Sequence, residues 1–337
     1  MRLDELATLL VLPELEHDVA IAEERLLAAL GRAAEPQLRT ASLRVATVSG
    51  KRLRPVFTVA AARVAGAKDL DRVHAASAAV ELVQIGSLVH DDLFEEAGTR
   101  RGVPTVNATE GKTAALLAGN FILAAAASEA ALSGQRVARM LAQTVAALCE
   151  GQVAEMRDQF NPDRTVDDYL RSIRGKTGVL FAAACRAGAY CADAPDEVVE
   201  SFGRFGEEFG MAFQLLDDVL DFVADPDRLG KPTGIDLATG VYTLPVILAR
   251  ELRTGPALRV QLARRGDADL ALVRSLITDA GTLSATLAEA SRFAASASGS
   301  IEHLEGDVAA GLRALARTYV GWAVEHFTTP AGQVGLI

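Results

Sequence analysis

The stretch LVHDDLFEE at residues 88–96 decides how this chain is interpreted, and FQLLDDVLDF at residues 213–222 repeats its pattern. In both stretches, carboxylates stand at positions i, i+1 and i+4 among apolar residues. They are Asp91, Asp92 and Glu95 in the first stretch, and Asp217, Asp218 and Asp221 in the second. Residues i and i+4 share a helix face, so each set directs two carboxylates to one point.

The residues before these carboxylates predict two long helices. Apolar residues recur every three or four positions from Asp71 to Glu96 and from Glu197 to Val223, which leaves no wide polar face. Helix-forming residues dominate the rest of the chain, and neither a linker nor a short repeat divides it. We therefore expect an all-α fold, a single-domain helical bundle over residues 1–337 with a central apolar cavity.

Composition excludes several classes of protein. The 337 residues include 34 Lys and Arg against 44 Asp and Glu, a net charge of −10, which argues against a general nucleic-acid binder. Three cysteines without a CxxC pair are too few for a disulfide scaffold or a zinc site. The most apolar stretch, Ala114–Ala127, is too short for a membrane span, and acids interrupt the N-terminal apolar stretch. We expect a soluble cytoplasmic protein.

Carboxylates buried among leucines and phenylalanines require neutralisation. Two like charges about 5 Å apart repel by roughly 3 kcal/mol at an effective dielectric near 20. Clusters of carboxylate oxygens suit Mg²⁺, which takes few protein ligands and completes its shell with water and substrate phosphates. A solvated acidic face is the alternative, and two copies inside apolar helices disfavour it. His90, beside the first pair, is better explained as a structural hydrogen-bond donor than as a base.

Four groups of cations flanked by glycine or proline complement the acids. They are GKRLRP at 50–55, RRGVPT at 100–105, RGKTG at 174–178 and GKPTGID at 230–236. Arg and Lys in such settings bind phosphate groups. Two anion sites beside two metal-binding clusters indicate a reaction in which a diphosphate leaves an allylic carbon, assisted by Mg²⁺ in a dry helical cavity.

These motifs, in this order, resemble those of the trans-isoprenyl diphosphate synthases (polyprenyl synthetases) from about Gly50 to Pro245. Residues 246–330 show a helical pattern without a chemical motif. The resemblance implies an all-α bundle, usually a homodimer, that condenses isopentenyl diphosphate head to tail (1'-4) with an allylic diphosphate. It also implies three Mg²⁺ ions, with the released diphosphate as the final base.

The resemblance also assigns residues to roles. The metal ligands would be Asp91, Asp92, Glu95, Asp217 and Asp221. The catalytic residues would be Asp91, Asp92, Lys176, Asp217, Asp218 and Lys231. The isopentenyl diphosphate site would comprise Lys51, Arg54, Gln84 and Arg101, and the allylic diphosphate site Arg100, Lys176, Thr177, Gln214 and Lys231. Three positions depart from the family pattern: Glu95 replaces an Asp, Gln84 a common His, and Asn120 a common Asp.

Product length would depend on the helix that precedes Asp91. One helical turn rises about 5.4 Å, close to one isoprene unit, so residues one turn back decide whether a growing chain passes. Gly86 and Ser87 stand there, with Val83 a further turn back, and none is aromatic. In the family, aromatic residues at this point mark short-chain enzymes, so a product of about C30–C50 is expected by resemblance. Phe57, Phe121 or Phe181 could still supply a floor.

Three alternatives remain open at the level of sequence. The first is a shorter-chain farnesyl or geranylgeranyl diphosphate synthase. The second is a class I terpene cyclase, which would leave the second diphosphate site unexplained. The third is a non-catalytic regulatory subunit of a heteromeric synthase, which the two intact acidic stretches disfavour.

Overall fold

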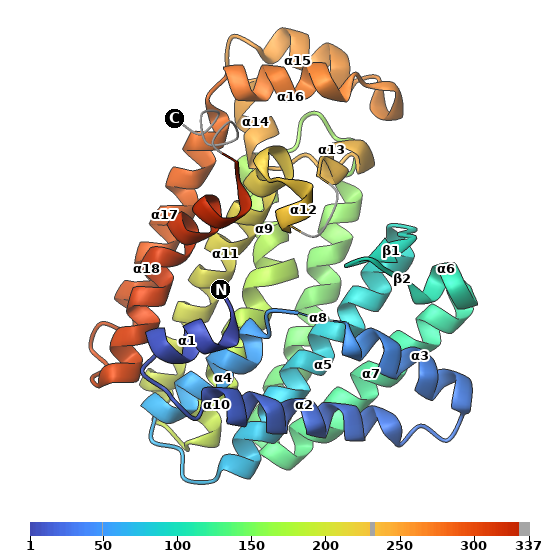
Figure 1. Cartoon of the computed structure of the whole chain (residues 1–337). Helices are drawn as coiled ribbons and strands as arrows, with labels where there is room; N and C mark the ends of the chain where they lie inside the picture. Colours follow the sequence, from blue (N-terminus) through green and yellow to red (C-terminus); the bar gives the residue numbers. More distant parts are fainter. Residues whose placement is uncertain (49, 230–232, 330–337) are drawn as a thin grey trace. The chain divides into compact units, whose positions relative to one another are not determined.

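Helices make up most of the chain in this computed structural model, which describes residues 1–48, 50–229 and 233–329 (Figure 1). Their bounds are α1 (Leu3–Leu9), α2 (Leu15–Gly31), α3 (Pro36–Thr47), α4 (Leu53–Val64), α5 (Leu70–Phe94), α6 (Val106–Glu110), α7 (Lys112–Ser133), α8 (Gln135–Arg157), α9 (Val166–Ile173), the π-helix η1 (Arg174–Gly178), α10 (Val179–Cys191), α11 (Asp196–Val223), α12 (Pro226–Leu229), α13 (Ile235–Thr239), α14 (Leu244–Arg250), α15 (Gly255–Leu262), the 3₁₀-helix η2 (Arg265–Asp267), α16 (Leu270–Asp279), α17 (Thr282–Ser300) and α18 (Asp307–Phe327).

The all-α prediction is confirmed, as are both long helices: α5 and α11 match the two apolar patterns within two residues at each end. The Asp69 side chain caps α5 by accepting a hydrogen bond from the amide of Arg72. The only strands in the described part of the chain form a two-residue hairpin, β1 (Thr99–Arg100) with β2 (Val103–Pro104). Its turn residues, Arg101 and Gly102, both have positive φ, as tight hairpin turns require.

The chain divides into two compact units. Unit 1 comprises Met1–Leu148, Val179–Glu207 and Ala297–Leu315; unit 2 comprises Cys149–Gly178, Glu208–Ser296 and Ala316–Ile337. Each unit carries one of the two acidic stretches. The single domain over 1–337 and the central cavity stay predictions.

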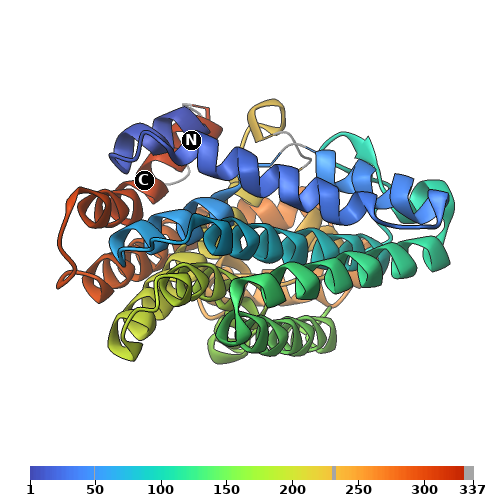
Figure 2. The same cartoon turned by 90° about the horizontal axis from the view of Figure 1, so that it is seen from below.

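Close helix packing in unit 1 depends on glycines. α5 lies along α7 (Figure 2). A Cβ on Gly86 would meet the Leu123 side chain at 3.0 Å. Gly119 faces the His90 ring so closely that a Cβ there would overlap it. His90 therefore packs against α7, which agrees with its structural interpretation. Gly86 is in contact with Leu123.

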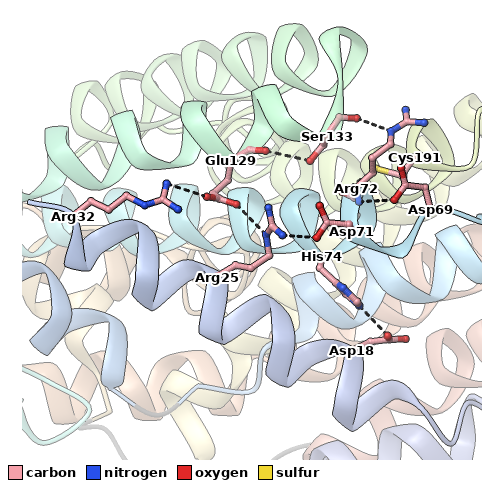
Figure 3. A network of polar contacts seen from close by, with 10 residues as sticks. All are labelled: Asp18, Arg25, Arg32, Asp69, Asp71, Arg72, His74, Glu129, Ser133 and Cys191. Atoms are coloured by element: carbon pink, nitrogen blue, oxygen red, sulfur yellow. Dashed lines mark hydrogen bonds and ion pairs between the residues drawn. The ribbon is translucent and has the colours of Figure 1, made fainter.

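A network of ion pairs fastens α2 to α5 and α7 (Figure 3). Buried Glu129 on α7 accepts a hydrogen bond from Arg25 at 3.2 Å, and Arg25 also binds Asp71 at 2.6 Å. Asp18, likewise buried, lies 2.9 Å from the His74 ring and 2.7 Å from Arg63. Each buried carboxylate thus has a charged or ring-nitrogen partner, as burial requires.

Unit 2 has its own hydrophobic core, which packs the end of α11 against α13 to α17. It contains Val219, Phe222, Leu237, Tyr242, Val246, Ala249, Leu258, Leu262, Val273, Ile277 and Leu283. This core holds the second acidic stretch in place, because Val219 and Phe222 alternate with its aspartates. The C-terminal helices therefore support the acidic stretch by packing.

One helix of the described residues, α7, is long and apolar enough to cross a membrane by length and composition. It has 22 residues, whereas the apolar stretch Ala114–Ala127, which the sequence predicts to be too short for a membrane span, has 14. About 39% of its most apolar window is buried inside the protein, and core helices meet the same criterion.

The three cysteines form no disulfide bond. Cys185 and Cys191 are buried and Cys149 is exposed, as expected for thiols without a structural role.

We expect Gly188→Ala to lower the free energy of unfolding by about 1–3 kcal/mol, because the added methyl group would overlap the carbonyl oxygen of Thr58 and force α10 away from α4. Urea denaturation measures the effect. Gly299→Ala on α17 is the matched control, since no atom lies within 4 Å of its Cβ position. That variant should be unchanged or more stable by up to about 1 kcal/mol. Equal losses in both variants would contradict the packing argument.

Candidate active site

The first acidic stretch lies at the C-terminal end of α5. Asp91 is half-buried, Asp92 is buried, and Glu95 is the exposed C-cap residue, whose amide donates to the Asp91 carbonyl oxygen at 2.8 Å. The helix thus carries the carboxylates from its apolar body to its solvent-exposed end. Glu95, one turn after Asp91, is where a longer side chain is most easily accommodated.

Arg100 neutralises this stretch within unit 1. Its Nε donates to Asp92 Oδ1 at 2.5 Å, and its Nη2 lies 3.7 Å from Glu95 Oε2. Burial raises the pKa of the Asp92 carboxyl, and the Arg100 guanidinium opposes that rise. The resemblance assigned Arg100 to an allylic diphosphate. The structure places it on two predicted metal ligands, and its role toward a diphosphate stays a prediction.

Two of the residues predicted to bind isopentenyl diphosphate, Arg54 and Arg101, lie close enough for their positive charges to repel each other. Arg54 lies over the Phe181 ring at 4.3 Å, and its buried Nε has no hydrogen-bond partner among the described residues. Burial lowers the pKa of Arg54 to about 10, so it stays charged at neutral pH. Gly50 leaves room for the Arg101 guanidinium, which a Cβ at 2.5 Å would displace. This arrangement suits an anion.

The other two residues of the predicted isopentenyl diphosphate site differ in exposure. Lys51 is exposed in the loop before α4, and Gln84 is half-buried on α5. Arg52, between Lys51 and α4, instead binds Glu23 at 2.6 Å and Glu81 at 2.8 Å. Arg52 therefore fixes the loop that carries Lys51 into α4.

The second acidic stretch, in unit 2, is organised around Asp218. This carboxylate is 2% exposed, and both of its oxygens accept hydrogen bonds: Oδ1 from Gln214 Nε2 at 2.9 Å, and Oδ2 from the Tyr169 hydroxyl. Gln214 in turn accepts from the Thr177 hydroxyl at 2.8 Å. These hydrogen bonds connect Thr177 through Gln214 to Asp218. Thr177 and Gln214, both predicted to bind the allylic diphosphate, are thereby linked to the second acidic stretch.

The pKa of Asp218 is raised to about 7: burial is the main cause, the Asp217 and Asp221 carboxylates add to the rise, and the hydrogen bonds from Tyr169 and Gln214 oppose it. Asp217 is half-buried, while Asp221 is buried and accepts from the amide of Asp236 at 3.4 Å. Since both oxygens of Asp218 already accept hydrogen bonds from neutral donors, Asp217 and Asp221 are the better candidates for metal coordination. The ligand set stays a prediction.

The RGKTG group forms the π-helix η1, an insertion that often occurs at functional sites. Lys176 Nζ donates to Glu155 Oε1 at 2.6 Å. Sequence reasoning missed both Glu155 and Tyr169. Tyr169 lies on α9, seven residues before Lys176, and nothing in the sequence pairs it with Asp218. Lys231 lies outside the described residues.

The donor set fits a hard divalent cation. The acidic stretches offer carboxylate oxygens, the ligands that Mg²⁺ prefers, and both lie in apolar helices. In residues 1–48, 50–229 and 233–329, no three His, Cys, Asp or Glu side chains converge on one point as a closed metal site. Mg²⁺ is commonly held by one or two carboxylates with substrate phosphates, so these residues fit an ion that arrives with its substrate.

Comparison with known proteins agrees with this chemistry. The model of the polyprenyl synthetase family matches residues 35–279. The chain is 36% identical over 309 residues to heptaprenyl diphosphate synthase component 2 of Geobacillus stearothermophilus, covering 91% of this chain and 96% of that protein. A polyprenyl synthase from Caulobacter crescentus, solved with calcium and isoprenyl diphosphate, superposes with a TM-score of 0.87 at 31% identity and covers 94% of this chain and 97% of that one. Other relatives are named nonaprenyl and geranylgeranyl diphosphate synthases.

Tyr169→Phe removes one hydroxyl and leaves Asp218 Oδ2 without its donor. Leaving a buried charged acceptor unpaired costs about 1–3 kcal/mol, so we expect that loss in the free energy of unfolding at pH 8.5 in Mg²⁺-free buffer. Urea denaturation measures it. Tyr319→Phe is the matched control, because the buried Tyr319 ring stacks on Phe213 and its hydroxyl makes no hydrogen bond to the other described residues.

The same substitution should depend on pH. Asp218 titrates near pH 7 in the folded protein, against an ordinary value of 3.8. The folded carboxyl is therefore mostly protonated at pH 5.5 and ionised at pH 8.5, while the unfolded one is ionised at both. The tyrosine hydrogen bond favours the ionised form, so its removal should cost more at the higher pH. An equal loss at both pH values would contradict this placement of Asp218.

Proposed function

The chain belongs to the polyprenyl synthetase family and is a prenyltransferase of the trans-prenyl diphosphate synthase type, and on that premise we propose that it condenses isopentenyl diphosphate head to tail with an allylic diphosphate. The product would be an all-trans polyprenyl diphosphate. The observation that carries the proposal is that the carboxylates and the cations are placed in different segments of the chain. Carboxylates occupy the ends of apolar helices, and cations outside them provide donors for a second, metal-free diphosphate.

The residues of unit 1 would bind isopentenyl diphosphate, and its acidic stretch would bind Mg²⁺. Arg54 and Arg101 offer guanidinium groups, and Lys51 adds a flexible ammonium. The buried Nε of Arg54 needs an acceptor, which a diphosphate oxygen would supply. The apolar face of α5, which includes Val83, would line the path of the growing chain and exclude water.

The residues of unit 2 would bind the allylic diphosphate through Lys176, Thr177 and Gln214, with Lys231 as a further cation by resemblance. Asp91, Asp92 and Glu95 of unit 1, and Asp217 and Asp221 of unit 2, would hold Mg²⁺, with three ions expected. When bound, Mg²⁺ would neutralise the allylic diphosphate and assist its departure. Asp218, held by Tyr169 and Gln214, would fix the orientation of its two neighbours.

The test is a condensation assay. Purified protein is incubated with Mg²⁺, labelled isopentenyl diphosphate and, separately, dimethylallyl, geranyl, farnesyl or geranylgeranyl diphosphate, and the dephosphorylated products are sized. We expect incorporation that chelation abolishes, and that Asp91→Asn or Asp217→Asn lowers by about 10²–10³-fold, the usual cost of losing charge stabilisation at a departing group. Glu150→Gln, an exposed carboxylate on α8, is the control. No incorporation with any primer would favour a regulatory subunit.

We further propose a product of about C30–C50, with shorter-chain synthesis as the alternative. Support comes from α5, where Gly86 and half-buried Ser87 stand one turn before Asp91 and neither is aromatic. Gly86 is backed by Leu123, so Ser87 is the position more open to change. Phe57 and Phe181 contact each other at 5.7 Å between ring centroids and are fully buried in unit 1.

Ser87→Phe should shorten the product, because the ring would narrow the path one turn from the metal-binding end of α5. The measurement is the length distribution of dephosphorylated products under the conditions of the condensation assay. Ser87→Ala keeps a small side chain and should give the wild-type distribution. If Ser87→Phe is active and makes wild-type lengths, the floor lies elsewhere and the C30–C50 proposal loses its support.

We also propose that two copies of the chain associate through α7. Between Thr113 and Leu132 the only charged residue is Glu129, and it is buried, so the exposed face of α7 carries no charge. Leu116, Leu117 and Leu132 are each about half exposed on this face. An uncharged, leucine-bearing helix face suits a second copy of itself about a two-fold axis.

The oligomeric state tests this directly. Light scattering after gel filtration should give a mass near twice 35.5 kDa for the wild type and near one chain for Leu117→Glu. Leu270→Glu, at an exposed leucine on α16, is the matched control and should leave the mass unchanged. A monomeric wild type would overturn the proposal, and recruitment of the monomer to lipid vesicles would assign the α7 face to a membrane.

A further inference from the structure

Lys176 is held by a carboxylate that no assigned role includes. Its ammonium lies 2.6 Å from Glu155 Oε1, and Glu155 comes from α8, more than twenty residues earlier in the chain. The two side chains are 25% and 14% exposed, so the pair is largely shielded from water. An ion pair in this setting is stronger and less sensitive to salt than a surface pair.

The backbone of α8 approaches the π-helix η1 closely at Gly151. A Cβ on this glycine would lie 2.6 Å from both the carbonyl carbon of Gly175 and the amide nitrogen of Lys176. Any larger residue would therefore push α8 away from η1. Gly151 and Glu155 are four residues apart and share a helix face, so the close approach at Gly151 brings Glu155 to the Lys176 side chain.

The backbone on the other side of Lys176 is also fixed. The hydroxyl of Thr177 donates to Gln214 Oε1 at 2.8 Å, and Gln214 in turn binds Asp218. η1 is thus anchored to the second acidic stretch through Thr177 and to α8 through Gly151. These contacts fix the backbone, so the conformational freedom that remains at Lys176 is that of its long side chain. The ion pair with Glu155 restricts that freedom.

We propose that Glu155 is a positioning residue that fixes the Lys176 ammonium for the allylic diphosphate, with Gly151 providing the close approach that this requires. The inference rests on the proposed function, which assigns Lys176 to that diphosphate. An ammonium has three donors, and the bond to Glu155 uses one of them. Glu155 acts through Lys176 and binds no substrate itself. A lysine already held in place loses less conformational freedom when the diphosphate binds.

The test separates the two substrates by steady-state kinetics with the full-length enzyme. Glu155→Ala should raise the KM for the allylic diphosphate about tenfold and change the KM for isopentenyl diphosphate less than about twofold. Glu155→Gln keeps an acceptor oxygen at the same reach and should recover most of the loss. Glu150→Ala, an exposed carboxylate on the same helix, should match the wild type. Circular dichroism melting shows whether each variant is folded. If Glu155→Ala is not, Glu155→Leu, which keeps the side-chain bulk without an acceptor, carries the comparison and should raise the allylic KM in the same way.

A double-mutant cycle distinguishes the possible failures. Lys176→Ala alone should raise the allylic KM, and Glu155→Ala should add little in that background, because its partner is gone. If Lys176→Ala leaves the allylic KM unchanged, the assignment of Lys176 in the proposed function fails. If Lys176→Ala acts but Glu155→Ala raises both KM values equally, or acts equally in both backgrounds, the positioning role is overturned. A lower allylic KM in Glu155→Ala would also overturn it, since Glu155 would then compete with the diphosphate.

Discussion

Carboxylates buried in apolar helices are the constraint on which the rest of this structure depends. Placing like charges next to one another away from water is unfavourable unless each receives donors or a counter-charge. Asp92 and Asp218 occupy equivalent places in the two acidic stretches, and both are almost fully buried. These two side chains account for the roles of Arg100 in β1, Tyr169 in α9 and Gln214 in α11, each of which donates a hydrogen bond to one of them.

The two stretches meet this constraint in different ways. In unit 1 a guanidinium from the β1–β2 hairpin balances Asp92, so part of the charge is already compensated. In unit 2 the donors to Asp218 are a phenol and an amide, which stabilise the carboxylate without adding positive charge. Burial accordingly raises the pKa of Asp218 to about 7. The second stretch therefore has the greater need for a cation, and a divalent ion with its diphosphate would supply it.

Sequence alone predicted what depends on local pattern and residue type. The apolar periodicity located α5 and α11, and the repeated carboxylate spacing located both acidic stretches. Contacts between distant segments could not be predicted, namely Tyr169 with Asp218 and Glu155 with Lys176. The local turn that brings Arg100 back to Asp92 was not predicted either. The length of α7 was underestimated because only its apolar middle was considered. Gly86 seemed open from sequence, while in the fold Leu123 lies against it. Such pairings follow from helix packing, which residue spacing does not encode.

Counting bound metal with and without diphosphate tests the central claim most directly, namely that the carboxylates serve as partial sites completed by phosphate oxygens. Mn²⁺ in place of Mg²⁺ can be counted by the loss of the free-ion electron paramagnetic resonance signal, first with protein alone and then with inorganic diphosphate. We predict weak binding to the protein alone, much tighter binding once diphosphate is present, and loss of that gain in Asp217→Asn. Mn²⁺ binding that is equally tight without diphosphate, or that Asp217→Asn does not alter, would contradict this account.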